Sequence, residues 1–131
     1  MELMQFKSYT WPYNPVKIEI TLGRDLRTRQ ARGFGTIISD WGQTGAKIQG
    51  EGEFFGENCR AQFESLRKVF LTEGSGKLIV PSFTPVYAYF ESLKVLGEGP
   101  LHTLRYAFSF VEDMERKISG GNSLSMGGVL S

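Results

Sequence analysis

Residues able to perform nucleophilic or metal chemistry are few in this chain. The 131 residues include one cysteine, Cys59, and one histidine, His102. Catalysis by a Ser/His/Asp or Cys/His set requires nucleophile, base and orienting acid to lie within hydrogen-bond reach. A zinc site requires several nitrogen and sulfur ligands. We therefore expect no catalytic residue, metal site, cofactor or small-molecule substrate, and hence no enzyme.

Two pairs of carboxylates could in principle act as acid and base. Glu51 and Glu53 alternate along one stretch, and Glu112 precedes Asp113. Paired carboxyl groups carry out glycoside hydrolysis, but no nucleophile and base converge on either pair. Glu51 and Glu53 would share a strand face with Lys47, and such a face more often contacts solvent or another subunit.

A run of four arginines is the strongest electrostatic feature. Arg24, Arg27, Arg29 and Arg32 are accompanied by a single acid, Asp25. The run is consistent with a solvated strand edge, with a contact to acidic strips of a neighbouring subunit, or with a nucleic-acid contact. The overall charge does not favour the last of these, because 15 Lys and Arg against 14 Asp and Glu leave a net charge of +1, without the basic excess of a phosphate-binding protein.

Alternating apolar residues predict strands in the first half of the chain. Val16, Ile18, Ile20 and Leu22 form one apolar face. We expect a turn at residues 23–25, a polar run over 26–32, a second strand over 33–38, a turn at residues 40–45 and a third strand over 46–54. Glycines inside that third strand, at positions 50 and 52, indicate a bulge or the close approach of another backbone.

One helix and a hairpin are predicted in the second half. An apolar stripe from Cys59 to Phe70 predicts a helix over about residues 57–73. Residues 86–113 predict a hairpin, in which Tyr87, Tyr89, Leu93 and Val95 would share one side of the first strand.

These elements predict one domain flanked by two segments. Residues 1–15 read as an extended aromatic and proline-rich N-terminal arm, in which Trp11 either fills the core or docks a neighbouring subunit. Residues 16–118 form the domain, an α+β fold in which five or six antiparallel strands make a sandwich or barrel-like sheet with one flanking helix. Residues 119–131, rich in Gly and Ser, read as a flexible tail. No segment has the length or apolar character of a membrane span or secretory signal.

The order of several short segments resembles a known family. They are residues 32–35, residues 50–57, the helix with Gln62, Leu66 and Phe70, residues 74–81 and residues 106–112. Together they are similar to small baseplate proteins of contractile phages and R-type bacteriocins, including the N-terminal domain labelled a DNA-circularisation protein in Mu-like phages.

The resemblance implies a tail-tube-like fold and a structural role. A subunit of this kind would form a ring, expected to be hexameric, which initiates the tail tube and adapts it to the hub or spike of the particle. We thus expect partners among copies of itself and neighbouring tail-tube and baseplate hub proteins, and a location in a virion or phage-like particle made in the bacterial cytoplasm. A nucleic-acid-binding module that uses Arg24 to Arg32 is the alternative. The candidate interface residues are Trp11, Pro12, Tyr13, Pro15, Arg24, Arg27, Arg29, Arg32, Glu51 and Glu53.

Overall fold

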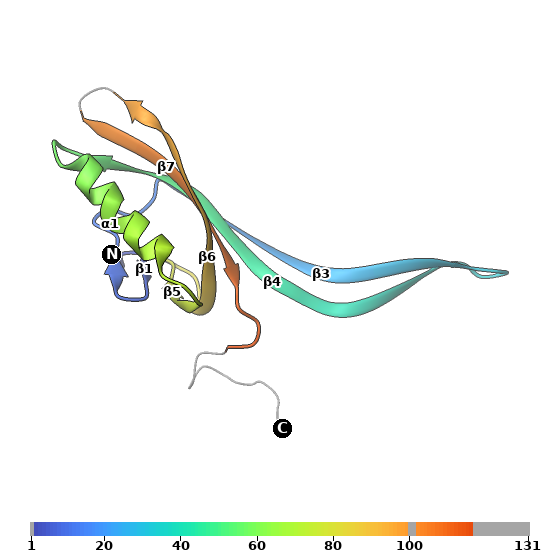
Figure 1. Ribbon diagram of the computed structural model, residues 1–131. Coiled ribbons are helices and arrows are strands. Elements are labelled where there is room, and N and C mark those ends of the chain that lie inside the picture. The colour runs from blue at the N-terminus through green and yellow to red at the C-terminus, as the bar shows by residue number, and fades with distance from the viewer. Residues whose placement is uncertain (1, 100–101, 117–131) are drawn as a thin grey trace.

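The chain folds as one antiparallel sheet with a helix packed on one face. The computed structural model describes residues 2–99 and 102–116, and Figure 1 shows their arrangement. Within these residues the strands are β1 (Gln5–Phe6), β2 (Tyr9–Thr10), β3 (Lys17–Ala31), β4 (Gly35–Phe55), β5 (Gly76–Ile79), β6 (Val86–Gly99) and β7 (Thr103–Glu112), and the helix is α1 (Cys59–Leu71). The predicted α+β class is confirmed, with seven strands in place of five or six. The predicted tail over 119–131 lies outside the described residues.

The sheet has the order β2-β1-β5-β6-β7-β4-β3, with every neighbouring pair antiparallel. The hairpin predicted over residues 86–113 is confirmed as β6 and β7. β4 joins this hairpin through a register that runs from Lys47 opposite Val111 to Phe55 opposite Thr103. The sheet therefore has the long strand β3 at one edge and the two-residue strand β2 at the other.

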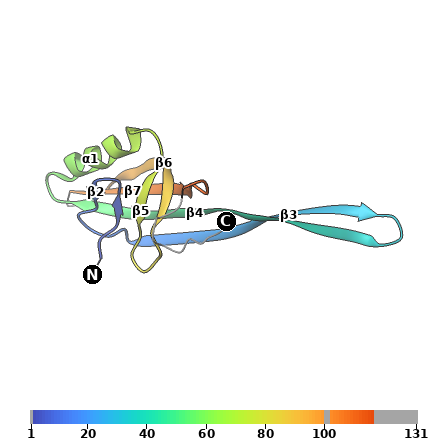
Figure 2. The same ribbon diagram turned by 90° about the horizontal axis from the view of Figure 1, so that it is seen from below.

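β3 and β4 form one long hairpin that projects from the rest of the molecule (Figure 1 and Figure 2). The two strands pair from Lys17 opposite Glu51 to Ala31 opposite Gly35. The turns predicted at residues 23–25 and 40–45 are therefore wrong. The chain reverses at residues 32–34 instead.

The segments mistaken for turns lie at two β-bulges, and the extra residue of each is in β4. Thr21 pairs with Lys47 and Gly23 with Thr44, so β4 carries one extra residue between the two pairs, and a second register shift follows between positions 24 and 26 of β3. Gly42, beside that second shift, has a φ of 101°. Glycine favours a bulge for the same reason that it favours a turn, since it accepts backbone angles that other residues avoid.

A bulge also corrects the predicted face of β6. Phe90 lies opposite Phe110 and Leu93 opposite Phe108, with a register shift between positions 90 and 92. Ala88 and Phe90 thus share the core-facing side with Leu93, and Tyr87 and Tyr89 point to the other side. The expected grouping of Tyr87 and Tyr89 with Leu93 and Val95 is wrong because an uninterrupted period of two does not hold across a bulge.

The predicted helix is confirmed, with ends at Cys59 and Leu71 in place of about 57 and 73. Its buried residues are Cys59, Phe63 and Leu66, which follow the spacing of an amphipathic stripe. The ring of Phe70 meets that of Phe90 edge to face at 5.1 Å. The helix therefore covers the apolar face of the strands β4, β6 and β7.

Aromatic rings fill the space beneath the helix. Phe54 stacks on Tyr106 with ring centroids 4.8 Å apart, and Phe90 stacks on Phe110 at 4.4 Å. Glycine makes this packing possible, because a side chain at Gly52 would collide with the Tyr106 hydroxyl and one at Gly50 with the Lys17 carbonyl oxygen. The predicted close approach of another backbone is confirmed at Gly50, whereas the close neighbour of Gly52 is the Tyr106 side chain.

Residues from the predicted N-terminal arm take part in the sheet. β1 pairs with β2 and with β5, where Gln5 lies opposite Ile79. Met4, Phe6 and Trp11 are fully buried. The arm thereby closes one end of the core.

Candidate assembly interface

The projecting hairpin is the least covered part of the described structure. Its stem, residues 22–27 and 39–44, and its tip, residues 28–38, lie beyond the last pair of β4 with β7, which joins Lys47 to Val111. Ten residues of β3 extend past that level, a reach of about 30 Å at roughly 3.3 Å per residue. In the described part of the chain no strand pairs with either long edge of the stem or tip.

Large apolar side chains on this hairpin face solvent. Phe34 is 84% exposed at the turn, and exposed apolar residues continue down both strands. They are Leu22, Leu26, Phe34, Ile38 and Trp41. An isolated two-stranded hairpin is marginal in water, and grouped exposed apolar side chains mark interaction sites. These properties favour coverage of the hairpin by another chain.

Stem charges are matched within the hairpin. Arg24 donates to Asp40 at 2.9 Å, and Arg27 donates to Asp25 at 3.1 Å. The Arg27 guanidinium also lies 4.2 Å from the ring centroid of Trp41. The backbone N–H of Gly42 and, next, the Arg24 side chain lower the pKa of Asp40 below its usual value. Two of the four candidate arginines are therefore already engaged.

The other two arginines, Arg29 and Arg32, belong to the tip. Both are exposed, and neither has an ion-pair partner within the described residues. The four arginines therefore do not act as one feature. Arg24 and Arg27 are paired with acids, whereas Arg29 and Arg32 are not, within the residues described.

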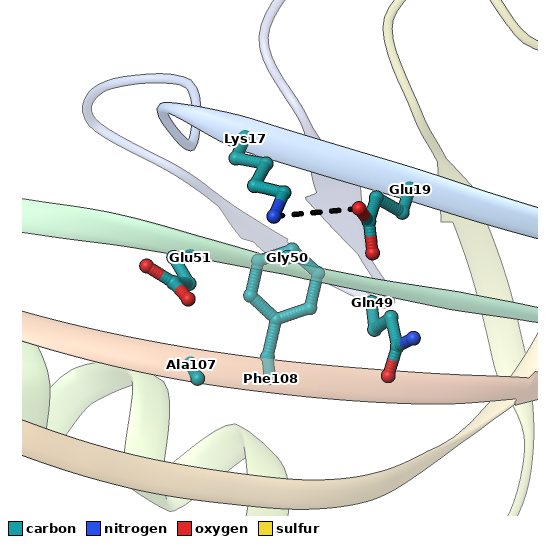
Figure 3. Close-up of a pocket in the computed structure, with 7 residues that line it drawn as sticks. All are labelled: Lys17, Glu19, Gln49, Gly50, Glu51, Ala107 and Phe108. Carbon is teal, nitrogen blue, oxygen red and sulfur yellow. Dashed lines mark ion pairs between the residues drawn. The ribbon is translucent and has the colours of Figure 1, made fainter.

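The candidate carboxylates lie on the open face of the sheet, away from the helix. Glu51 and Glu53 flank Arg105, with N–O distances of 4.0 Å and 3.7 Å. Next to Glu51 is a shallow, open hollow of about 250 Å³, where Lys17 and Glu19 form an ion pair at 3.3 Å (Figure 3). Each of these acids faces a cation, which is an arrangement of surface ion pairs and brings no nucleophile to them.

The N-terminal candidates are split between the core and the surface. Trp11 is fully buried, and its Nε1–H donates to the Tyr106 hydroxyl at 2.9 Å, so the alternative in which Trp11 fills the core describes its position. Pro15 is also buried, whereas Pro12 and Tyr13 are exposed. Tyr13 packs edge to face on Phe55 at 5.3 Å.

Two long backbone edges are open in the sheet. β3 pairs only with β4, so its outer edge is open over residues 17–31 of the described chain. On the other side of the four long strands, β6 pairs with β5 only through Val86, Tyr87 and Ala88. From Tyr89 onward the outer edge of β6 has no strand partner among the described residues. Such edges are templates for pairing with another chain.

The residues considered for chemistry lie apart from this hairpin. Cys59 is buried in α1, and His102 is exposed beside the start of β7. Over residues 2–99 and 102–116, no three His, Cys, Asp or Glu side chains form a group able to hold a metal ion. No helix in that part of the chain is long and apolar enough to span a bilayer.

Sequence reasoning missed the apolar members of the hairpin. Leu22, Leu26, Ile38 and Trp41 were scattered over predicted strands, turns and a polar run, whereas they share one hairpin. The sequence signal was the Gly33-Phe34-Gly35 segment, in which a glycine stands on each side of Phe34. In the structure both glycines have positive φ, 85° and 81°, and lie at the actual turn. A turn centred there would have aligned the two flanking segments as partners.

Comparison with known proteins identifies a similar fold. No protein-family model and no curated protein matches the sequence. The structure is similar to the crystal structure of SPP1 Dit (gp 19.1), described as a paradigm of the hub adsorption apparatus in phages that infect Gram-positive bacteria. The TM-score is 0.68 at 12% identity, over 86% of this chain and 49% of that one. The chain thus spans about half the length of SPP1 Dit and shares its fold over that half.

Proposed function

We propose that this chain is a structural component of a phage-like tail, a ring-forming subunit that initiates the tail tube or adapts it to the hub. Its fold is similar to that of a protein described as part of a phage hub adsorption apparatus. The observation that carries the proposal is the pair of long open strand edges, β3 on one side and β6 on the other.

The direction of the strands supports closure into a ring. The four long strands follow one another as β6-β7-β4-β3, each antiparallel to the next. Because their number is even, β3 of one copy would also run antiparallel to β6 of the next copy. Such a contact uses two different surfaces, and it forms a closed ring when the rotation per copy divides a full turn. We propose six copies, as in the family that the sequence resembles.

The two faces of the sheet determine its orientation in this ring. One face is covered by α1 (Figure 1) and carries the aromatic core. The other face carries the ion pairs around Arg105. The bulkier face belongs on the outside of a closed curve, where space per copy is greatest. The charged face would then line the opening and stay hydrated.

Electron microscopy of the purified chain, alone and mixed with the products of its neighbouring genes, tests the ring. We expect closed rings in at least the mixture. Substitution of Leu22 and Leu26 by Lys should abolish them, because both apolar side chains would be covered by the neighbouring copy. Leu71→Lys, at an exposed position of α1, is the matched control and should leave the rings intact.

Two results would overturn this proposal. One is a chain that stays monomeric in the complete mixture of tail proteins. The other is ring formation that is unaffected by the two stem substitutions. We propose no catalytic role for the chain, and turnover of a small molecule by the monomer would contradict the structural assignment directly.

A further inference from the structure

The hairpin tip differs from the stem in its charge. Residues 28–38 include Arg29 and Arg32 and no Asp or Glu, whereas the stem contains Arg24, Arg27, Asp25 and Asp40. The stem neutralises itself through ion pairs. Each of the two guanidinium groups at the tip has five N–H donors, which can bind a partner outside the described chain. An acidic partner is the chemical complement of this tip.

Apolar side chains at the tip point in more than one direction. Phe34 occupies the turn and is 84% exposed, and Ile37 and Ile38 are neighbours in β4, so they project to opposite faces. Ile38 is exposed and Ile37 is half-buried. A flat surface could cover only one of these faces. A groove with two apolar walls could cover both.

The tip is already ordered for docking. The Phe34 N–H donates to the Ala31 carbonyl oxygen at 3.0 Å, and the Gln30 side chain donates to the Thr36 hydroxyl at 2.9 Å across the turn. These bonds order the backbone of the turn, which places Phe34 at the end of the hairpin before any partner arrives. An ordered turn loses little backbone entropy on binding, and an aromatic residue close to two arginines has the composition of an interface hot spot.

We propose that the hairpin tip docks into an acidic groove with apolar walls on a different protein of the same particle. This inference rests on the proposed function. Arg29 and Arg32 would pair with carboxylates at the rim of the groove, and Phe34 would fill its floor. A reach of about 30 Å beyond the β7 level takes the tip past the body of its own subunit.

A second copy of the chain does not offer such a groove on its open sheet face. The acids there already face cations, since Glu19 pairs with Lys17, Glu91 with Lys47, and Glu51 with Arg105. An incoming arginine would have to displace a cation at each of them. The open sheet face of a second copy is therefore not the acidic groove, which needs unmatched carboxylates.

Nucleic acid and anionic lipid fit the tip less well. Two cations would contact about two phosphates, which gives weak and salt-sensitive binding, and stable electrostatic attachment to a bilayer takes a cluster of about four or more. Neither surface offers apolar walls to both Ile37 and Ile38.

Photocrosslinking in the assembled particle tests this inference. A benzophenone amino acid in place of Phe34 should crosslink, in particles purified from producing cells, to a peptide of another tail protein that contains Asp or Glu beside apolar residues. The same probe in place of Leu71, on α1, should give different products. Adding Arg29→Glu and Arg32→Glu should reduce the Phe34 product by about tenfold or more, the equivalent of 1.4 kcal/mol or more, whereas Arg29→Lys and Arg32→Lys should retain most of it.

Each outcome of this experiment has a defined meaning. Crosslinks only to a second copy, to nucleic acid or to lipid, or products unaffected by charge reversal, would overturn the docking inference. Rings of normal shape formed by the Arg29→Glu, Arg32→Glu variant, together with loss of the crosslink, would support it. Absence of the chain from purified particles would instead refute the proposed function itself.

Discussion

Trp11 and Tyr106 meet in the core although 95 positions separate them in the sequence. The indole N–H donates to the phenol oxygen at 2.9 Å, and burial raises the pKa of Tyr106 above its ordinary value. Burial likewise raises the pKa of Tyr9, to about 12. Both phenols therefore stay neutral over the physiological range, and the Trp11–Tyr106 bond ties the N-terminal segment to β7.

Replacing Tyr106 by Phe should destabilise the fold. The change leaves the buried Trp11 N–H without its acceptor, at a cost of about 1–3 kcal/mol. Urea denaturation measures this free energy. A double-mutant cycle with Trp11→Phe isolates the bond, and Tyr13→Phe, at an exposed position, should change stability little. Equal effects of Tyr106→Phe with Trp and with Phe at position 11 would contradict the coupling.

Asp113 should make stability sensitive to acid. Its pKa is lowered first by the hydrogen bond from the Ser75 hydroxyl, at 2.7 Å, and then by the backbone N–H of Glu115 and the nearby Arg116. A folded-state pKa below the unfolded value contributes stability above the unfolded pKa of about 3.9, and this contribution is lost as the pH falls through the folded pKa. Thermal denaturation from about pH 6 down to about pH 2 should show a shallower decline for Asp113→Asn. An unchanged pH dependence would argue against this bond.

At the scale of elements, the projecting hairpin contributes no buried core residue. The buried apolar residues nearest to it in β4 are Ala46 and Ile48. The domain and the projection should therefore be separable.

Shortening the hairpin tests that separation. If residues 24–43 are replaced by an Asn-Gly turn, which suits a two-residue hairpin loop, we expect the thermal midpoint of the domain to change little. Ring formation should be lost. Circular dichroism on heating and light scattering measure the two properties. A shortened chain that fails to fold would show that the projection supports the core.

Elements were predictable where one local signal was sufficient. The helix has an uninterrupted apolar stripe, and β7 alternates without a bulge, so both could be predicted from sequence. The long hairpin could not, because Gly and Asp at positions 23–25 and 40–45 have the same local preferences in a turn and in a bulge. Only pairing with a partner strand decides between the two structures, and that pairing is not local.

At the scale of the whole molecule, the α+β class followed from the balance of one helix and several strands. The strand order could not be predicted in this way, because many pairs of strand edges could form hydrogen bonds and the sequence does not show which pairs do. The position of Trp11 also depended on this order, since the short strands β1 and β2 bring it under the sheet. The matched and unmatched halves of the arginine run became distinguishable only when Asp40 was placed beside Arg24.

The whole molecule should bind nucleic acid weakly. A net charge of +1 and the pairing of Arg24 and Arg27 with acids leave few cations for phosphates. We expect no mobility shift of a labelled single-stranded oligonucleotide at about 150 mM salt. Tight binding that weakens steeply as salt is raised would favour the nucleic-acid alternative over assembly.

The two bulges in β4 have a consequence for how this chain can change in length. β3 carries no extra residue, so its alternation passes both bulges unbroken, and its partners in β4 stay on the same side as the β3 residues that they face. Each bulge thus absorbs one residue locally, without a slip of the register beyond it. Deleting one residue at Gly42 or at Gly45 should remove a bulge and leave Ile38 opposite Thr28, on its original side. Single-residue deletions at these two sites should therefore be tolerated one at a time.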